Sequence, residues 1–224
     1  MIITIDGPAG SGKSTAARLL AKTLGIAYLD TGATYRALTL AAMQRELNLA
    51  DEAALADLAG RLDLHMEPAE TGTVVVLNGR DVSAEIRTAE VTDKAHHAAD
   101  SPAVRAVLVT LQRRIGEELA RRSGGVVAEG RDQGSVVFPD ADVKFYLDAS
   151  PEVRARRRYE EMAARGEDVS LQQVLEAIRR RDQRDRSRPA GPLVRPPGAI
   201  EIDTSDMTVE QMVSELLRWV RRAR

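Results

Sequence analysis

The chain has 224 residues, of which 43% are hydrophobic and 29% are charged, and its formal net charge is −2. This size and composition are typical of one globular domain that can include inserted subdomains. A chain of this length can bury a large core without disulfides or structural metals. The chain has no cysteine, which excludes disulfides, thiolate catalysis and cysteine-ligated zinc. We expect no membrane span and no secretory signal. The slightly acidic balance argues against a protein that coats nucleic acid.

The N-terminal part alternates strands and helices. Residues 1–6 read as a short buried strand, and a helix is predicted over 15–24, with Gly25 as its C-terminal stop. A second strand is expected at 26–30, followed by a helix from Thr31 to about Leu47. Strand, helix and strand in this order predict a parallel sheet with right-handed crossovers.

The middle of the chain has a different pattern. Residues 61–66 alternate apolar and polar side chains, and the β-branched run 73–77 is followed by the turn pair Asn78-Gly79. Short strands this close together favour a small antiparallel insert, which we place at about 60–92. Ser101 and Pro102 then open a helix that runs to about Arg122.

The parallel pattern returns in the second half. Strands are predicted at 125–129, 143–147 and 199–203. Ser150 and Pro151 open an arginine-rich helix that ends near residues 165–166, and a capping box at 170–173 opens a second one, about 171–187. Residues 189–197 form a proline-rich loop, and Thr208 caps a last amphipathic helix.

The first loop carries the pattern GxxxxGK[ST] between a strand and a helix. Its glycines let successive N–H groups face one concavity, to which the helix N-terminus adds positive potential. Lys13 is expected to reach the β- and γ-phosphates of a nucleoside triphosphate, and the Ser14 hydroxyl to ligate Mg²⁺. The residues predicted to hold ATP are Gly7, Pro8, Ala9, Gly10, Ser11, Gly12, Lys13, Ser14 and Thr15.

Arginines supply most of the positive charge elsewhere. Arg181, Asp185 and Arg188 share one helical face at i, i+4 and i+7, which is explained either by a second anion site or by a solvated face with an intrahelical ion pair. Arg154, Arg157, Arg158 and Arg165 likewise form either a lid over the triphosphate or an ordinary surface. No base-reading Asn-Lys-x-Asp motif of a GTPase is present, and no strand ends in Asp-Glu as in motor ATPases. These patterns favour a small-molecule phosphotransferase.

The order of the motifs resembles the bacterial cytidylate kinases, a family of nucleoside monophosphate kinases. The P-loop alone is generic, but the tyrosine-arginine, Gly-Arg-Asp and Arg-Asp segments are specific to this family, and together the matches cover nearly the whole chain. The matching segments are 3–13, 28–36, 85–88, 129–134, 136–140 and 181–188.

The resemblance implies a role for each matching residue. Arg36, Arg131 and Arg188 would grip the phosphate of CMP, and Arg181 and Asp185 would hold the ribose hydroxyls. Thr31, Arg105 and Asp132 would face cytosine. Catalytic roles then go to Lys13, Arg131, Arg188 and, from the lid, Arg157. The sequence departs from the family at His96, where a serine often assists base recognition.

The implied fold is a three-layer P-loop kinase with a parallel central sheet, a small antiparallel insert and a helical lid. We expect a core formed by residues 1–30, 93–150 and 169–224, an NMP-binding region at 31–92 and a lid at 151–168. The implied enzyme is a cytoplasmic monomer that uses CMP, dCMP, ATP and Mg²⁺, and neither nucleic acid nor a membrane is an expected partner. Transfer to a phosphate needs no general base, since the acceptor is already an anion.

Three alternatives stay open at this point. Another small P-loop kinase, such as a shikimate or different nucleotide kinase, would differ only in its acceptor. A regulatory module would bind ATP without forming ADP. Nucleic-acid binding by the arginine helices would show strong dependence on salt.

Overall fold

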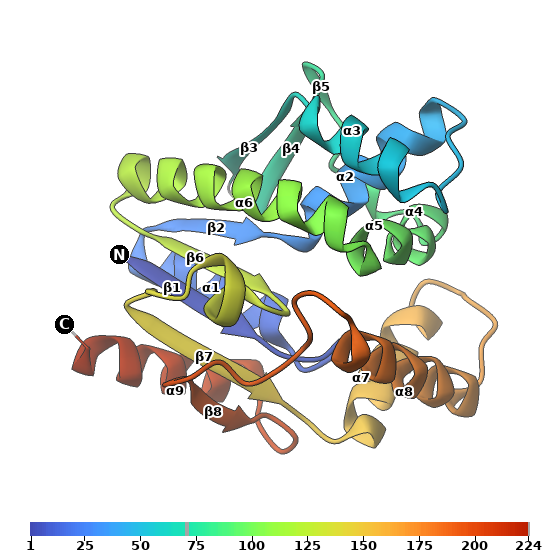
Figure 1. The fold of residues 1–224 in the computed structure, drawn as a ribbon. Helices are drawn as coiled ribbons and strands as arrows, with labels where there is room; N and C mark the ends of the chain where they lie inside the picture. Colours follow the sequence, from blue (N-terminus) through green and yellow to red (C-terminus); the bar gives the residue numbers. More distant parts are fainter. Residues whose placement is uncertain (70–71, 224) are drawn as a thin grey trace.

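A parallel sheet of five strands forms the centre of the molecule in the computed structural model, which describes residues 1–69 and 72–223 (Figure 1). The spatial order is β2-β6-β1-β7-β8. In this register Asp6 lies beside Gly130, and Asp30 beside Glu129, so polar residues gather at the carboxyl ends of three adjacent strands. The strands are β1 (Ile2–Asp6), β2 (Ala27–Asp30), β6 (Val126–Gly130), β7 (Val143–Asp148) and β8 (Ile200–Asp203).

Helices cover both faces of this sheet and complete the three predicted layers. Along β6, Val126 and Ala128 face one hydrophobic core and Val127 faces the other, because successive side chains of a strand point to opposite sides. In Figure 1, α6 lies along one side of the sheet and α9 along the other. The first core packs against α2 (Gly32–Gln44) and α6 (Pro102–Ser123), the second against α1 (Lys13–Leu24) and α9 (Val209–Arg222).

The predicted antiparallel insert is confirmed as a three-stranded sheet in the order β3-β4-β5. Its turn uses Asn78 and Gly79 at positive φ, as the residue pair predicts. The Thr73 hydroxyl donates to the carbonyl oxygen of Tyr28 at 2.7 Å, which ties the insert to the edge strand of the main sheet. The strands are β3 (Leu64–Ala69), β4 (Gly72–Leu77) and β5 (Arg80–Asp81).

Several short elements of the structure have no clear pattern in the sequence. The predicted helix over 31–47 ends earlier, at Gln44, because Glu46 adopts a left-handed φ of 54°. The short helices span too few turns for an apolar period to stand out. They are α3 (Glu52–Gly60), η1 (Glu85–Arg87), α4 (Ala89–Lys94), α5 (His96–Asp100) and the π-helical turn η2 (Gln133–Val137).

The two arginine-rich helices, α7 (Pro151–Ala163) and α8 (Leu171–Ser187), pack against each other through a small core of their own. The capping box at Ser170 and Gln173 is confirmed. Arg154 is not a free lid cation, since its side chain is only 1% exposed and forms a two-pronged ion pair with Asp182 at 2.6 and 3.0 Å. This pair fastens α7 to α8.

Candidate functional site

The phosphate loop joins β1 to α1 with the geometry its glycines predict. Gly10 and Gly12 have φ of 80° and 84°, in the left-handed region that only glycine adopts freely. Arg154 donates to the carbonyl oxygen of Ala9 at 3.1 Å, and the Thr204 hydroxyl donates to that of Ser11 at 2.9 Å. Because these carbonyl oxygens are engaged from outside, the loop offers its N–H groups to an anion.

Lys13 lies beneath this loop beside a carboxylate from β6. Its Nζ is 3.4 Å from the carbonyl oxygen of Pro8 and 3.9 Å from Oε2 of Glu129. Burial and the nearby charge of Arg131 lower the pKa of Lys13 to about 8, although Glu129 acts in the opposite direction. A triphosphate bound in the loop would place negative charge beside this ammonium group and so stabilise its charged form.

Glu129 joins the loop to the edge strand β2, and although the matching segment 129–134 contains it, the sequence assigns it no role. Its Oε1 accepts hydrogen bonds from the Ser14 hydroxyl at 2.7 Å and the Tyr28 hydroxyl at 3.1 Å. Burial and the charge of Glu129 raise the pKa of Tyr28, which therefore stays a neutral donor. The signal available in the sequence is a carboxylate that ends the strand beside the loop.

The oxygens of Ser14 and Glu129 fit the magnesium ion expected with ATP. Mg²⁺ prefers oxygen ligands, and in nucleotide sites one or two protein ligands suffice because phosphates and waters complete the octahedron. Among residues 1–69 and 72–223, no three His, Asp or Glu side chains form a metal cluster. Two protein oxygens, from Ser14 and Glu129, fit a metal whose other ligands come from a nucleotide and water.

A second cationic region lies along α8 and beside the carboxyl ends of β6 and β2. We call it the arginine rim, and it consists of Arg36, Arg131, Arg181 and Arg188 around Asp185. Arg131 donates to one carboxylate oxygen of the buried Asp185 at 2.7 Å, and Arg188 donates to the other. Arg188 also donates to Asp100 of α5 at 2.7 Å. Burial alone would raise the pKa of Asp185, but these two arginines lower it below its usual value. Asp185 is therefore a buried carboxylate and not part of a solvated face, although the intrahelical Asp–Arg pair of that interpretation is present and Arg181 is exposed.

Two further arginines belong to the rim. Arg36 donates to Asp30 at 2.6 Å, at the carboxyl end of β2. Arg181 has an exposed side chain and no ion pair within the part of the chain that the structure describes. Partial desolvation lowers its pKa to about 10, helped by the positive charges of Arg131, Arg188 and Arg36. Such an excess of positive charge is suited to an anion.

The rim lies within electrostatic reach of the phosphate loop. Arg131 and Arg181 contribute to the lowered pKa of Lys13, and Asp185 acts on it in the opposite direction. Contacts link the two regions as well, because Lys13 Nζ lies 3.9 Å from Glu129, and Arg131, two residues after Glu129, pairs with Asp185 at 2.7 Å. Contacts therefore connect Lys13, through Glu129, with Arg131, Asp185 and Arg188, and the charges of Arg36 and Arg188 act on Arg181.

The three residues expected to face cytosine occupy two adjoining places. Arg105 and Asp132 form a buried ion pair, and the Arg105 guanidinium lies 5.4 Å from the centre of the Tyr35 ring. Burial raises the pKa of Asp132, although Arg105 acts in the opposite direction. Thr31 is also buried, and its hydroxyl donates to the carbonyl oxygen of Glu129 at 2.7 Å.

Arg157, the expected lid catalyst, lies against the outer side of the phosphate loop. It donates to the carbonyl oxygen of Thr204 at 2.6 Å. The other lid arginines pair with carboxylates of the same region, Arg158 with Glu161 at 3.1 Å and Arg165 with Glu167 at 3.0 Å. His96, the departure from the family, contacts the carbonyl oxygen of Asp93 at 2.7 Å through Nδ1.

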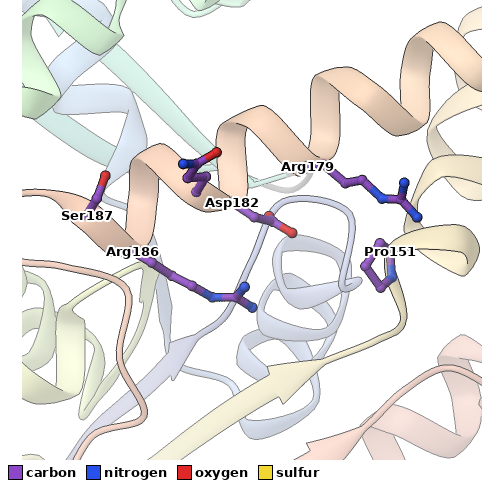
Figure 2. A pocket seen from close by; sticks show the side chains of 6 residues that line it. Pro151, Arg179, Asp182, Arg186 and Ser187 are labelled. Carbon is purple, nitrogen blue, oxygen red and sulfur yellow. The ribbon is translucent and has the colours of Figure 1, made fainter.

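A hollow of about 390 Å³ lies between α8 and the start of α7 (Figure 2). Its lining residues recur along α8 on the face opposite Arg181 and Asp185, so the hollow is separate from the arginine rim. Of the lining residues, Asp182 connects to the phosphate loop, because it pairs with Arg154, which donates to the carbonyl oxygen of Ala9. The lining consists of Pro151, Arg179, Asp182, Gln183, Arg186 and Ser187.

Comparison with known proteins places this geometry in a family. The family model described as cytidylate kinase matches residues 3–222. A cytidylate kinase of Pelotomaculum thermopropionicum is 48% identical over 223 residues, which cover 99% of this chain and 96% of that protein. A cytidylate kinase of Caldanaerobacter subterraneus is 46% identical over 220 residues, 98% of this chain and 94% of that protein.

One solved structure adds a likeness of fold alone. An uncharacterized protein from Eubacterium ventriosum is 12% identical, with a TM-score of 0.50 over 99% of this chain and 98% of that chain. No helix in the described ranges has the length and apolar character needed to span a membrane.

Proposed function

The chain belongs to the cytidylate kinase family, and we propose that it transfers the γ-phosphoryl group of ATP to CMP, giving ADP and CDP. The observation that carries this proposal is the closeness of two anion sites: Lys13 of the phosphate loop lies 3.9 Å from Glu129, and Arg131, two residues later, pairs with Asp185 of the arginine rim. A triphosphate donor and a monophosphate acceptor are a pair of ligands that such a site can bind together.

The rim arginines would bring two mutually repelling anions together. Two unit charges 4 Å apart repel by about 4 kcal/mol at an effective dielectric constant of 20. Arg36, Arg131 and Arg188 would bind the acceptor phosphate, and Lys13 the donor phosphates. The Asp185 carboxylate keeps Arg131 and Arg188 oriented before the substrate binds, which lowers the cost of ordering them.

No general base is required, because a phosphate monoester is largely ionised at neutral pH. Its oxygen attacks the γ-phosphorus as the bond to the β-phosphate oxygen breaks, and the charge then rests on ADP. Magnesium, held by Ser14 and Glu129, would neutralise charge on the donor phosphates. Closure of residues 151–168 over the site would exclude water and so prevent hydrolysis of ATP.

The buried pair of Arg105 and Asp132 supports cytosine as the base. A carboxylate accepts a hydrogen bond from the exocyclic amine of cytosine, and Arg105 donates to ring acceptors. UMP would place a carbonyl against the carboxylate and leave buried groups unpaired, at about 1–3 kcal/mol. Arg181 and Asp185 would hold the ribose hydroxyls, so dCMP is expected to be a weaker substrate than CMP.

The proposal includes the setting of the reaction. We infer that the enzyme acts as a monomer in the cytoplasm, in pyrimidine nucleotide metabolism, on small-molecule substrates alone.

The decisive experiment is to measure ADP production from ATP and Mg²⁺ with CMP, dCMP, UMP, AMP, GMP and shikimate. We expect the highest kcat/KM with CMP, a lower value with dCMP and a still lower one with UMP. Equal kcat/KM for CMP and UMP would contradict the assignment of Asp132. ATP binding without ADP formation with any acceptor would contradict the proposed function.

A further inference from the structure

Asp6 is a buried carboxylate that the proposed chemistry does not use. It ends β1, directly before Gly7 of the phosphate loop, and no part of it is exposed to solvent. It forms no ion pair with any residue that the structure describes. A buried charge with no cationic partner carries a cost in folding free energy unless its hydrogen bonds satisfy it.

Both oxygens of Asp6 accept backbone N–H groups from the segment that follows β6. Oδ1 accepts from Gln133 at 2.7 Å, and Oδ2 accepts from Gly134 at 2.8 Å. Both bonds are short and fully buried, as is typical of hydrogen bonds to an ionised acceptor. Burial nevertheless raises the pKa of Asp6 to about 7, with the two N–H groups acting in the opposite direction.

The segment held in this way begins with the acceptor residues. Arg131 and Asp132 immediately precede Gln133, and the π-helical turn η2 starts there. The carbonyl oxygen of Asp132 is itself fixed by the N–H groups of Val136 and Val137, at 2.9 and 3.1 Å. The turn and its two functional side chains therefore form one unit, and Asp6 attaches that unit to the residue before the phosphate loop.

We propose that Asp6 is a positioning residue that sets the acceptor-binding segment 131–134 in register with the phosphate loop. This role rests on the proposed function, because it concerns the alignment of an acceptor phosphate on Arg131 with a donor phosphate on Lys13. In-line transfer is sensitive to such alignment, and a displacement of about 1 Å can cost on the order of 10²-fold in rate.

The role differs in a measurable way from simple support of the fold. Each substrate still meets an intact binding surface when Asp6 is replaced, so the affinities for ATP alone and CMP alone should change little. Only the relation between the two surfaces is disturbed, and this relation affects kcat. Because the charge of Asp6 is costly to bury, a neutral replacement removes that cost and should not lower thermal stability strongly.

The test compares Asp6→Asn with Asp142→Asn. Asp142 accepts the N–H of Ile2 at 2.6 Å, at the opposite end of the same strand, so the control makes the same substitution at a backbone-bonded carboxylate far from the site. We expect Asp6→Asn to lower kcat at least tenfold, with each binary Kd changed less than threefold and Tm lowered by no more than about 5 °C. Asp142→Asn should leave kcat within twofold of the unmodified enzyme.

Amide hydrogen exchange provides a readout independent of activity. The N–H groups of Gln133 and Gly134 should be protected in the unmodified protein and should exchange at least tenfold faster in Asp6→Asn. Should that variant fail to fold, Asp6→Ser keeps one acceptor without the extra amide donors and is measured instead. Unprotected amides in the unmodified protein would overturn the proposal, whichever variant folds.

Failure of the positioning role of Asp6 can be distinguished from failure of the proposed kinase activity. A kcat within threefold of the unmodified enzyme would overturn the role of Asp6, and so would parallel losses of kcat, both affinities and stability. If the unmodified protein phosphorylates no CMP, the proposed function fails, while amide exchange still reports whether Asp6 holds the segment.

Discussion

The phosphate loop and the arginine rim solve the same task, binding an anion, in different ways. The loop is contiguous, from Gly7 to Ser14, and relies on backbone N–H groups with one lysine loosely paired to Glu129 at 3.9 Å. The rim is assembled from separate elements of the chain, and three of its arginines, Arg36, Arg131 and Arg188, are tightly paired with carboxylates.

This difference shows two routes to a prepared anion site. The loop is shaped by its glycines and held from outside by Arg154 and Thr204, so the charge of Lys13 can be titrated or removed with little change of shape. The rim is fixed by its ion pairs, so removal of one arginine leaves a buried carboxylate partly unpaired. Substitutions in the loop should therefore affect chemistry most, and substitutions in the rim should affect both acceptor binding and local structure.

The largest effect is expected for Lys13→Ala. The lysine is the loop's only side-chain cation, and loss of such a group in a dry site typically costs about 10²–10³-fold in kcat. Steady-state kinetics with saturating CMP would measure the loss. Lys144→Ala is the matched control, because this lysine lies on β7 outside the site and should leave kcat unchanged. Retention of more than a tenth of the activity by Lys13→Ala would contradict its role.

A somewhat smaller loss, about 10²-fold in kcat/KM for CMP, is expected for Arg188→Ala. The substitution removes a phosphate contact, leaves Asp100 without this partner and leaves Asp185 with Arg131 alone. Arg186→Ala, two residues earlier on α8, is the control. Arg188→Lys should recover only part of the loss, because an ammonium group lacks the planar fork. A KM for CMP unchanged in Arg188→Ala would contradict acceptor binding by this residue.

The same contrast explains what the sequence can predict. The phosphate loop is contiguous, so a spacing pattern identifies all of it, and the strands and capping boxes of the sheet are found by local rules. Helix α8 is predicted at 171–187, as observed, because Ser170 and Gln173 mark its start. The short helices α4 and α5 are stabilised by packing and have too few residues to show a period.

The partners of the rim arginines lie beyond any local rule. Nothing near Arg188 in the sequence indicates Asp100, which is 88 residues away. The same holds for Asp6 and Gly134, 128 residues apart. The resemblance to the family supplies the arginines and their expected roles. Only the folded chain shows that Glu129 accepts from both Ser14 and Tyr28, or that Arg154 holds the loop instead of the substrate.

Base selection should show a moderate effect. In Asp132→Asn the buried carboxylate that pairs with Arg105 becomes an amide, which can present either a carbonyl or an amine to the base. We expect the ratio of kcat/KM for CMP over UMP to fall about tenfold, in keeping with one mispaired buried group. The measurement is competition between CMP and UMP in one reaction. An unchanged ratio would contradict a role of Asp132 in base recognition.

The smallest effect concerns pH and distinguishes the two regions without any substitution. Burial lowers the pKa of Lys13 to about 8, so the free enzyme loses this proton as the pH rises above that value. The triphosphate favours the charged lysine, so ATP binding at pH 9 should take up a proton and be several-fold weaker than at pH 7. Calorimetry in two buffers of different ionisation enthalpy measures the uptake.

CMP binding should change less over this range, because the pKa of Arg131 is raised and Arg181 loses its proton only near pH 10. ATP binding without proton uptake at pH 9 would mean that Lys13 keeps its charge in the free enzyme. Its pairing with Glu129 would then stabilise the charged lysine as strongly as the rim carboxylates stabilise their arginines.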